Sequence, residues 1–271
     1  MSERRHRWAV AFVATVVAGC GAKTGLEIEE RDAGLEIDAP RATDASRPRS
    51  DAPVDPCEPD PGLPPPVLRY TFDGDLRDTG ALGPLHEGEA IEGVELVGGR
   101  CGGAVVVGDP GYVRFADTAR VLASLDAVTI DVWIREEVAT RTGPVFVGCR
   151  SALHGFHAYR GVAPARFTIC WGAGRPPEGP GGCGGATLDA GVWHRLAFRY
   201  EGPGAPFEVY VDGELARSFE PEAADYDLFG ATVNDLFVGS DPESPGGARS
   251  RISIDELRVY DVALDPAELA P

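Results

Sequence analysis

The sequence predicts an all-β fold, a sandwich of two antiparallel sheets, and the stretch from Trp193 to Phe219 carries much of this prediction. Two runs in it alternate apolar and polar residues with the period of two that a β-strand requires. Asp212-Gly213 interrupts the second run, and this dipeptide favours a type I′ hairpin turn, in which both central residues have positive φ. Similar short runs recur from Val67 onward with Gly, Pro and Asp between them, as in antiparallel β proteins.

The predicted strands follow one another to the end of the chain. They are LRYTF (68–72), AVVVG (104–108), YVRFA (112–116), VTIDVWIRE (128–136), PVFVGC (144–149), FHAYR (156–160), RFTICW (166–171), the two runs of the hairpin, DLFVG (235–239) and ISIDELRVYD (252–261). No helical stripe precedes the final DPAELA, which has room for one turn, and the Gly-rich GGCGGA (181–186) indicates a mobile loop. Many short strands at this spacing are typical of a single sandwich or barrel domain, here residues 67–271.

The charge balance excludes one class of function. The chain has 271 residues, with 25 Lys and Arg against 43 Asp and Glu, a formal net charge of −18. A nucleic-acid surface needs a basic patch to neutralise phosphates, so we expect no nucleic-acid partner.

The first 19 residues predict an export signal. Basic residues come first, and the uncharged apolar run from Trp8 to Ala18 follows them. This run is too short to span a bilayer, which takes about 20 residues, but it fits the apolar region of a secretory signal. Val17-Ala18-Gly19-Cys20 resembles the bacterial lipobox, and this resemblance implies that Cys20 becomes the first mature residue and carries acyl chains.

The alternative is an ordinary secretory signal with a chance cysteine. If Cys20 is lipidated, the protein is exported and anchored to the bacterial membrane. Gly21, in place of an Asp, then suggests the outer membrane, facing the periplasm or the cell surface.

Residues 20–66 predict a disordered linker. Pro, Asp and Ala dominate this segment and aromatic residues are absent from it. Such a composition does not bury enough apolar surface to offset the entropy of ordering the chain, and its prolines favour an extended spacer.

Seven local motifs in order resemble the concanavalin A-like LamG family. They cover nearly all of Leu68 to Leu269 and read LRYTFDGDLRDTG, GGRCGGAVVVGDPGYVRFA, VTIDVWIRE, GVWHRLAFRYEG, FEVYVDGELA, DLFVGS and ISIDELRVYDVALDPAEL. The resemblance implies a jelly roll of two curved antiparallel sheets.

The last predicted strand contains an irregularity. Ile252 and Ile254 alternate in one phase and Leu257 and Val259 in the other, so the pattern slips at Asp255-Glu256. A β-bulge inserts one residue in this way and redirects a side chain.

A calcium site follows from this bulge and from the resemblance. LamG-like and related glucanase domains often hold a structural calcium where the first and last strands meet, and Ca²⁺ takes about six to eight oxygen ligands. We therefore predict Ca²⁺ bound by Asp73, Asp78 and Asp255, with the carbonyl of Gly74. The alternative is that these aspartates cap turns through hydrogen bonds to the backbone.

A ligand groove is predicted on the strand VTIDVWIRE. Asp131, Trp133 and Arg135 face away from its apolar side, and an aromatic ring flanked by polar groups suits a sugar ring. Packing of Trp133 beneath a covering loop is the alternative. Further groove candidates are Trp171, Tyr159 and Arg150.

Catalysis is not expected. Retaining glycosidases need two carboxylates about 5–5.5 Å apart, which laminarinase-type members carry on one strand as Glu-x-Asp-x-x-Glu. That string is absent, Asp131 stands alone in its strand, and Asp255 and Glu256 are adjacent.

Five cysteines follow the lipobox, and export permits disulfides. Cys170 and Cys183 bracket a Gly/Pro-rich segment and are the first choice for a pair, which would contribute about 3 kcal/mol. Cys57 with Cys101 is the second choice, and Cys149 is then free.

These features together predict a membrane-anchored lipoprotein whose LamG-like domain binds a glycan, or an envelope or extracellular protein, without catalysis. A glycoside hydrolase or lyase, and a structural envelope protein without a small ligand, are the alternatives.

Overall fold

The computed structural model describes residue 57 and residues 62–108, 111–116, 118–138, 143–148, 156–163, 166–173, 181–220, 235–240 and 251–269. All of them belong to one compact unit, Ala52–Pro271. The predicted signal peptide, Cys20 and most of the predicted linker lie outside the described residues, as do Cys149 and Arg150. Within the described part, no helix combines the length and the apolar character that crossing a membrane requires.

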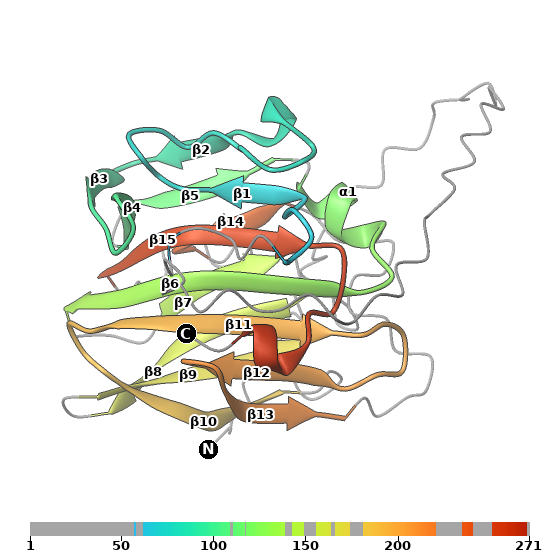
Figure 1. The fold of residues 1–271 in the computed structure, drawn as a ribbon. Helices are drawn as coiled ribbons and strands as arrows, with labels where there is room; N and C mark the ends of the chain where they lie inside the picture. The colour runs from blue at the N-terminus through green and yellow to red at the C-terminus, as the bar shows by residue number, and fades with distance from the viewer. Residues whose placement is uncertain are drawn as a thin grey trace, which may run out of the picture. The chain divides into compact units, whose positions relative to one another are not determined.

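The strands form two antiparallel sheets, which confirms the predicted fold class (Figure 1). Sheet A has the order β13-β12-β11-β6-β15-β4-β3, with β1 also paired to β15. Its strands are β1 (Leu68–Tyr70), β3 (Glu95–Gly98), β4 (Gly103–Val107), β6 (Val128–Val138), β11 (Trp193–Tyr200), β12 (Phe207–Val211), β13 (Glu214–Phe219) and β15 (Arg251–Tyr260).

Sheet B has the order β10-β9-β8-β7-β14-β5-β2. Its strands are β2 (Gly88–Ile91), β5 (Tyr112–Phe115), β7 (Gly143–Gly148), β8 (Phe156–Ala163), β9 (Arg166–Ala173), β10 (Gly181–Asp189) and β14 (Leu236–Val238).

One apolar cluster joins the two sheets and forms the core. Alternate residues of several strands contribute to it, such as Ile130 of β6 in sheet A and Val113 of β5 in sheet B. A second, smaller cluster lies on the outer face of sheet A, where residues after β15 pack onto β11 and β12 (Figure 1). Its members are Ala197, Tyr210, Tyr260, Leu264 and Leu269, with Leu63 packed against them.

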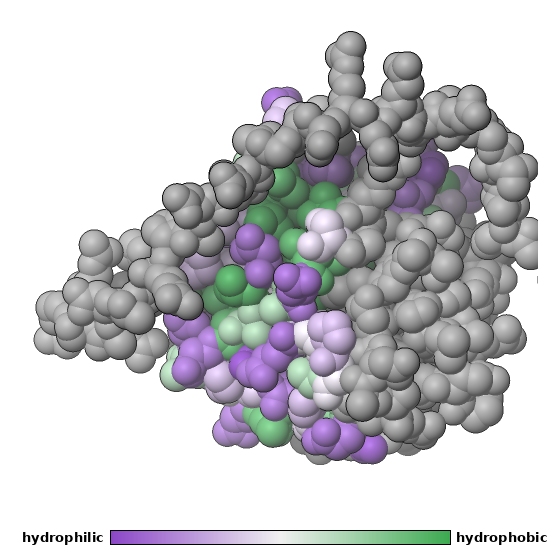
Figure 2. All heavy atoms as spheres, turned by 90° about the vertical axis from the view of Figure 1, so that its right-hand side faces the viewer, coloured by the Kyte–Doolittle hydropathy of each residue, from purple (hydrophilic) through white to green (hydrophobic). Residues whose placement is uncertain are grey.

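The described surface on one side of the molecule has both hydrophobic and hydrophilic residues. Figure 2 views the molecule from the right-hand side of Figure 1, and there hydrophobic residues gather in the middle of the described surface, with hydrophilic residues predominating below them.

The first and last strands of the sandwich lie side by side. β1 pairs with the second half of β15, with Leu68 opposite Val259 and Tyr70 opposite Leu257. This pairing brings residues about 190 positions apart in the sequence into one sheet, as the family resemblance implied.

Both backbone irregularities expected from the sequence are present. Asp212 and Gly213 have φ of 50° and 83°, as a type I′ turn requires. Between Asp255 and Arg258, β15 holds one residue more than its partner β6, and Glu256 has a φ of 46°. This bulge places both Asp255 and Glu256 on the outer side of sheet A, since the residues on either side of them alternate into the core.

Two local expectations were wrong. A six-residue helix, α1 (Thr118–Ala123), follows β5, and it is too short to show a helical stripe. GGCGGA lies in β10, because its backbone pairs with β9 across a bulge between Cys183 and Thr187. The structure also has two short 3₁₀ helices, η1 (Pro84–His86) and η2 (Pro266–Glu268), and the second is the turn expected in DPAELA.

A disulfide joins Cys57 to Cys101, with their Cα atoms 5.1 Å apart. It was the second choice from the sequence, and it ties the end of the predicted linker to the turn between β3 and β4. The backbones of Cys170 and Cys183 are directly opposite each other on β9 and β10. Their side chains lie outside the described part, so their pairing stays a prediction.

Candidate functional site

The outer face of sheet A carries a buried group of charged side chains. Asp131, on β6, is 1% exposed, and Arg195, on β11, donates to both of its carboxylate oxygens over 2.8 and 2.9 Å. Arg258, on β15, approaches the same carboxylate at 3.7 Å. Burial alone would lower the pKa of Arg195, but the charge and hydrogen bonds of Asp131 outweigh it and the pKa is raised. Because Asp131 is nearly fully buried and both of its oxygens are bonded by Arg195, the pair is closed to a ligand.

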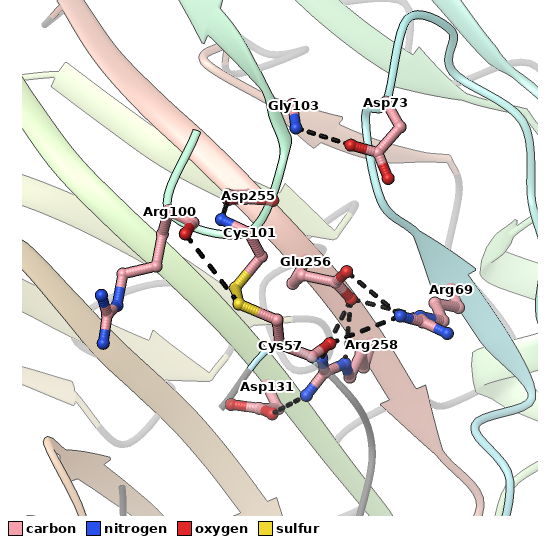
Figure 3. Close-up of a disulfide and its surroundings, with 10 residues drawn as sticks. All are labelled: Cys57, Arg69, Asp73, Arg100, Cys101, Gly103, Asp131, Asp255, Glu256 and Arg258. Carbon is pink, nitrogen blue, oxygen red and sulfur yellow. Dashed lines mark hydrogen bonds and ion pairs between the residues drawn. A yellow bond between two sulfur atoms is a disulfide. The ribbon is translucent and has the colours of Figure 1, made fainter. Parts of the chain in front are cut away.

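A second group of charges lies where β1 meets β15 (Figure 3). Arg69 and Arg258 are register partners, and both donate to the carboxylate of Glu256 over 3.0–3.2 Å. Both also donate to the carbonyl oxygen of Cys57, over 3.5 and 2.6 Å respectively. The bulge makes this arrangement possible, because it turns Glu256 to the face that Arg258 already occupies.

Trp133 is packed beneath the turn between β3 and β4. Trp133 is only 5% exposed, and the guanidinium of Arg100 lies 4.8 Å from the centroid of its ring. This position matches the alternative of packing beneath a covering loop. A sugar cannot stack on the ring face that Arg100 covers, so Trp133 and Asp131 are poor candidates for direct ligand contact.

Arg135 belongs instead to a partly exposed group at one end of the same face. Its guanidinium lies 4.8 Å over the ring of Trp193, its register partner on β11, and donates to Glu137 over 2.9 and 2.7 Å. The hydroxyl of Ser253 donates to the same oxygen of Glu137. The side chains of Arg135 and Glu137 are 28% and 26% exposed, and Trp193 is half-buried. Ser253 itself is buried, and we call the other three residues, Arg135, Glu137 and Trp193, the exposed strip.

The exposed strip carries a negative charge, on the Glu137 carboxylate that Arg135 bonds. Burial would raise the pKa of Glu137, but hydrogen bonds from Ser253 and Arg135 and the charges of Arg135 and Arg251 outweigh it, so the pKa is lowered. Glu137 is therefore a carboxylate at neutral pH. Arg135 covers one face of the Trp193 ring, but Trp193 is half-buried where Trp133 is buried, so part of the ring remains accessible beside a charged donor and acceptor. An accessible aromatic surface with polar groups next to it is suited to hold a sugar ring.

Two residues of the predicted calcium site meet the β3–β4 turn from different elements (Figure 3). Asp73 accepts a hydrogen bond from the backbone amide of Gly103 over 2.6 Å, and Asp255 accepts one from that of Cys101 over 2.8 Å. Each carboxylate thus caps part of the turn, as the alternative from the sequence proposed.

Asp78 occupies a separate turn. It is 3% exposed and accepts hydrogen bonds from the amides of Arg69 and Gly80, over 2.9 and 2.8 Å, while Gly74 has a φ of 96° in a turn of its own. In the part of the chain that the structure describes, no three His, Cys, Asp or Glu side chains are grouped so as to hold a metal ion. Calcium binding stays a prediction, which a melting scan with and without chelator tests.

Asp255 has an unusual titration. Burial is the main reason that its pKa is raised to about 6, the neighbouring charge of Glu256 raises it further, and backbone hydrogen bonds oppose both. A raised pKa of this kind suits a general acid, but Asp255 is 0% exposed behind the β3–β4 turn. It is therefore closed to a substrate.

Two of the remaining groove candidates, Trp171 and Tyr159, are in sheet B. Trp171, on β9, pairs with Ala158, and Tyr159, on β8, pairs with Cys170. Their side chains, and Arg150 as a whole, lie outside the described part, so their predicted roles stay predictions.

Sequence reasoning found Arg135 but missed its partners in the exposed strip. Trp193 was assigned to its strand without a role, and Glu137 follows the last residue of the predicted strand. The cross-strand register that places Trp193 opposite Arg135 was the missing information.

Comparison with solved structures finds the same fold in other proteins. Domain 4 of AbnA, a GH43 extracellular arabinanase from Geobacillus stearothermophilus solved in complex with arabinotriose, has a TM-score of 0.58 and 22% identity over 75% of this chain and 96% of its own. A structure of botulinum neurotoxin type C, described as dependent on two ganglioside molecules for cell entry, has a TM-score of 0.56 and 10% identity over 76% of this chain. The binding domain of botulinum neurotoxin DC in complex with rat synaptotagmin II has a TM-score of 0.55 and 12% identity over 75% of this chain. This chain spans 50% of each toxin chain.

A comparison with curated protein sequences found no match. The sequence model of the concanavalin A-like lectin/glucanases superfamily matches residues 108–270, more than half of the chain. These residues include the strands of both sheets from β5 to β15. The chain belongs to the concanavalin A-like lectin/glucanase superfamily.

Proposed function

We propose that this protein is a membrane-anchored lipoprotein whose jelly roll binds carbohydrate at the cell envelope without catalysis, through the exposed strip. The observation that carries the proposal is the half-buried ring of Trp193, with Arg135 over one of its faces and Glu137 hydrogen-bonded to that arginine. Aromatic faces and planar polar groups are what sugar-binding sites use to hold and orient a ring.

Two relatives in fold add support, since one was solved with arabinotriose and another is described with gangliosides. A third was solved with a protein, so an envelope or extracellular protein is the second candidate ligand. The fold alone does not choose between them, and the exposed strip favours the glycan.

The proposal that the domain is not catalytic is supported by three described carboxylates on this face that a substrate cannot reach, which leaves Glu137 as the carboxylate of the exposed strip. Asp131 and Glu256 are buried in ion pairs with arginines, and Asp255 is sealed behind a turn. A glycosidase needs an acid and a second carboxylate that both reach the glycosidic bond.

Binding is tested with a glycan array and a reducing-sugar assay on the purified chain. We expect retention of at least one glycan and no release of reducing ends from it. Trp193→Ala should lower the affinity for the retained glycan at least tenfold, because stacking on an aromatic ring contributes about 1–3 kcal/mol in comparable sites. Release of product would establish the hydrolase instead.

Arg217→Gln is the matched control for Arg135→Gln. Arg217 also lies over an aromatic ring, at 5.3 Å from the centroid of Phe219, but on β13, away from the exposed strip. Arg135→Gln should weaken glycan binding and Arg217→Gln should not. Equal effects of the two changes would exclude the exposed strip as the binding site.

The proposed anchor is tested separately. The wild-type protein should fractionate with the membrane and Cys20→Ser should not, because the serine variant carries no acyl chains. Identical fractionation of the two would exclude lipidation, and it would leave the glycan-binding proposal untouched.

A further inference from the structure

The exposed strip continues across the outer face of sheet A. Strand pairing places Trp193 of β11, Arg135 of β6, Ser253 of β15, Val106 of β4 and Glu95 of β3 opposite one another in turn. None of these residues belongs to the core between the sheets, and the row that they form lies at the left-hand end of sheet A in Figure 1. Since neighbouring strands are about 4.8 Å apart, the row extends over about 19 Å.

Charged side chains cover the middle of this row. Glu137 accepts a hydrogen bond from the buried Ser253, and Arg251 of β15 donates one to Glu95 over 2.9 Å. β4 lies between β15 and β3, so the side chain of Arg251 crosses β4, where Val106 is only 3% exposed. The side chains of Arg251 and Glu95 are themselves 42% and 55% exposed. We call the accessible residues of this surface the polar row; they are Trp193, Arg135, Glu137, Arg251 and Glu95.

The polar row has no net charge. Arg135 is paired with Glu137, and Arg251 is paired with Glu95. The charge of Arg251 also acts on Glu137, where it helps to lower the pKa of that carboxyl. An acidic ligand therefore finds each arginine of the row beside a carboxylate of the protein, which repels the charge of the ligand.

The described surroundings of the polar row add no positive excess. Arg100, which lies over Trp133, belongs to the β3–β4 turn, and the carboxylate of Asp255 is buried beneath this turn. The pKa of Asp255 is about 6, so this carboxylate is mostly ionised at neutral pH and offsets the charge of Arg100. The chain as a whole has a formal net charge of −18, which repels acidic ligands at low ionic strength.

We propose that the ligand of the exposed strip is an uncharged linear polysaccharide, whose chain lies across the strands of sheet A from Trp193 to Glu95. This inference rests on the proposed function and narrows it to one class of glycan. One sugar ring contacts Trp193, and the following sugars of the chain reach Arg251 and Glu95. Guanidinium N–H groups donate to sugar hydroxyls, and carboxylate oxygens accept from them. A single terminal sugar is too short to contact both ends of the row.

The first test is which glycans the purified full-length protein retains. The array carries linear neutral glucans, mannans, xylans and galactans, beside oligogalacturonates, sulfated galactans and branched glycans with terminal sugars. We expect retention of a linear neutral glycan, and we expect Trp193→Ala to weaken it. Calorimetry then follows the retained chain from the monosaccharide to the hexasaccharide. The tetrasaccharide should bind at least about tenfold more tightly than the disaccharide, because only the longer chain reaches the pair of Arg251 and Glu95.

Arg251→Ala should remove the gain from chain length. It should lower the affinity for the tetrasaccharide about tenfold and leave the affinity for the disaccharide unchanged. Arg114→Ala is the matched control, because Arg114 is 43% exposed and is paired with Asp235 and Glu89, but it lies on β5 of sheet B. This change should alter neither affinity. Both arginines form exposed ion pairs, so neither change should unfold the protein, which circular dichroism checks. Glu95→Ala is a second variant with the same expected effect as Arg251→Ala.

The outcomes separate this inference from the proposed function. If the glycans whose retention depends on Trp193 are acidic or branched, the inference is overturned and the proposed function holds. The same conclusion follows if the tetrasaccharide binds no more tightly than the disaccharide, or if Arg114→Ala weakens it as much as Arg251→Ala does. If no glycan is retained, or if Trp193→Ala leaves retention unchanged, the proposed function fails and this inference fails with it.

Discussion

Arg195 donates two hydrogen bonds to the carboxylate of Asp131 on the neighbouring strand, and both side chains are largely buried. The pair lies on the outer face of sheet A, and segments from both ends of the described chain cover parts of this face. Its energetic role follows from this burial.

Removing one partner of this pair should destabilise the fold strongly. Asp131→Asn keeps the shape of the side chain but leaves the Arg195 charge buried without its carboxylate, which costs about 3–5 kcal/mol. Urea denaturation measures the change. Asp75→Asn is the control, because Asp75 pairs with Arg77 at 3.0 Å with both side chains about half exposed or more, and its loss should cost less than about 1 kcal/mol.

The Cys57–Cys101 disulfide should also stabilise the fold. It closes a loop with a sequence separation of 44 residues, for which the chain-entropy estimate is about 4 kcal/mol. We expect Cys57→Ser with Cys101→Ser to lower the free energy of unfolding by this order under oxidising conditions. In dithiothreitol the wild type and the double variant should unfold at the same urea concentration. A difference that persists there would point to the serine side chains.

Stability should depend on pH through Asp255. Its pKa is raised to about 6 from the ordinary 3.8, so between about pH 4 and pH 6 the folded state binds more protons than the unfolded state. The free energy of unfolding therefore falls as the pH rises through this window, by about 2–3 kcal/mol from this group. Asp255→Asn does not titrate, and the difference in stability between wild type and variant, measured from pH 4 to pH 7, should change by this amount. Parallel profiles would contradict the assignment.

The paired glycines of β3 and β4 should differ in how much an added methyl group destabilises the fold. A Cβ at Gly103 would lie 2.1 Å from the carbonyl oxygen of Phe72, whereas one at Gly98, its register partner, would meet nothing within 4 Å. Gly103→Ala should cost about 3 kcal/mol or more, because the neighbouring atoms are backbone and must move. Gly98→Ala should stay within about 0.5 kcal/mol of the wild type in thermal or urea unfolding.

The sequence was sufficient for most of the fold because the apolar residues alternate so regularly. Period-two patterns gave the core strands, Asp212-Gly213 gave the hairpin, and the slip at Asp255-Glu256 gave the bulge. The strands β2, β3 and β10 were missed, since they are rich in Gly and charged residues and are held in the sheets by pairing with neighbours. The local pattern of apolar and polar residues does not predict which strands pair.

The site was harder to predict for the same reason. Period two correctly placed Asp131, Trp133 and Arg135 on the outer side of their strand. The pattern does not predict which side chains contact these three residues, because Arg195, Arg100 and Trp193 come from other parts of the chain. Whether an outward-facing residue meets solvent or another part of the chain is decided by tertiary contacts.

The Cys57–Cys101 bond also determines how the domain responds to a mechanical load. Tension applied to the chain on the N-terminal side of Cys57 passes through the two sulfur atoms to the start of β4 and bypasses residues 58–100. β1 lies inside this bypassed loop, so a pull from that side does not peel it away from β15. A domain held by its N-terminal tether would thus keep its edge strand under strain, and it would lose this protection wherever the cross-link is cut.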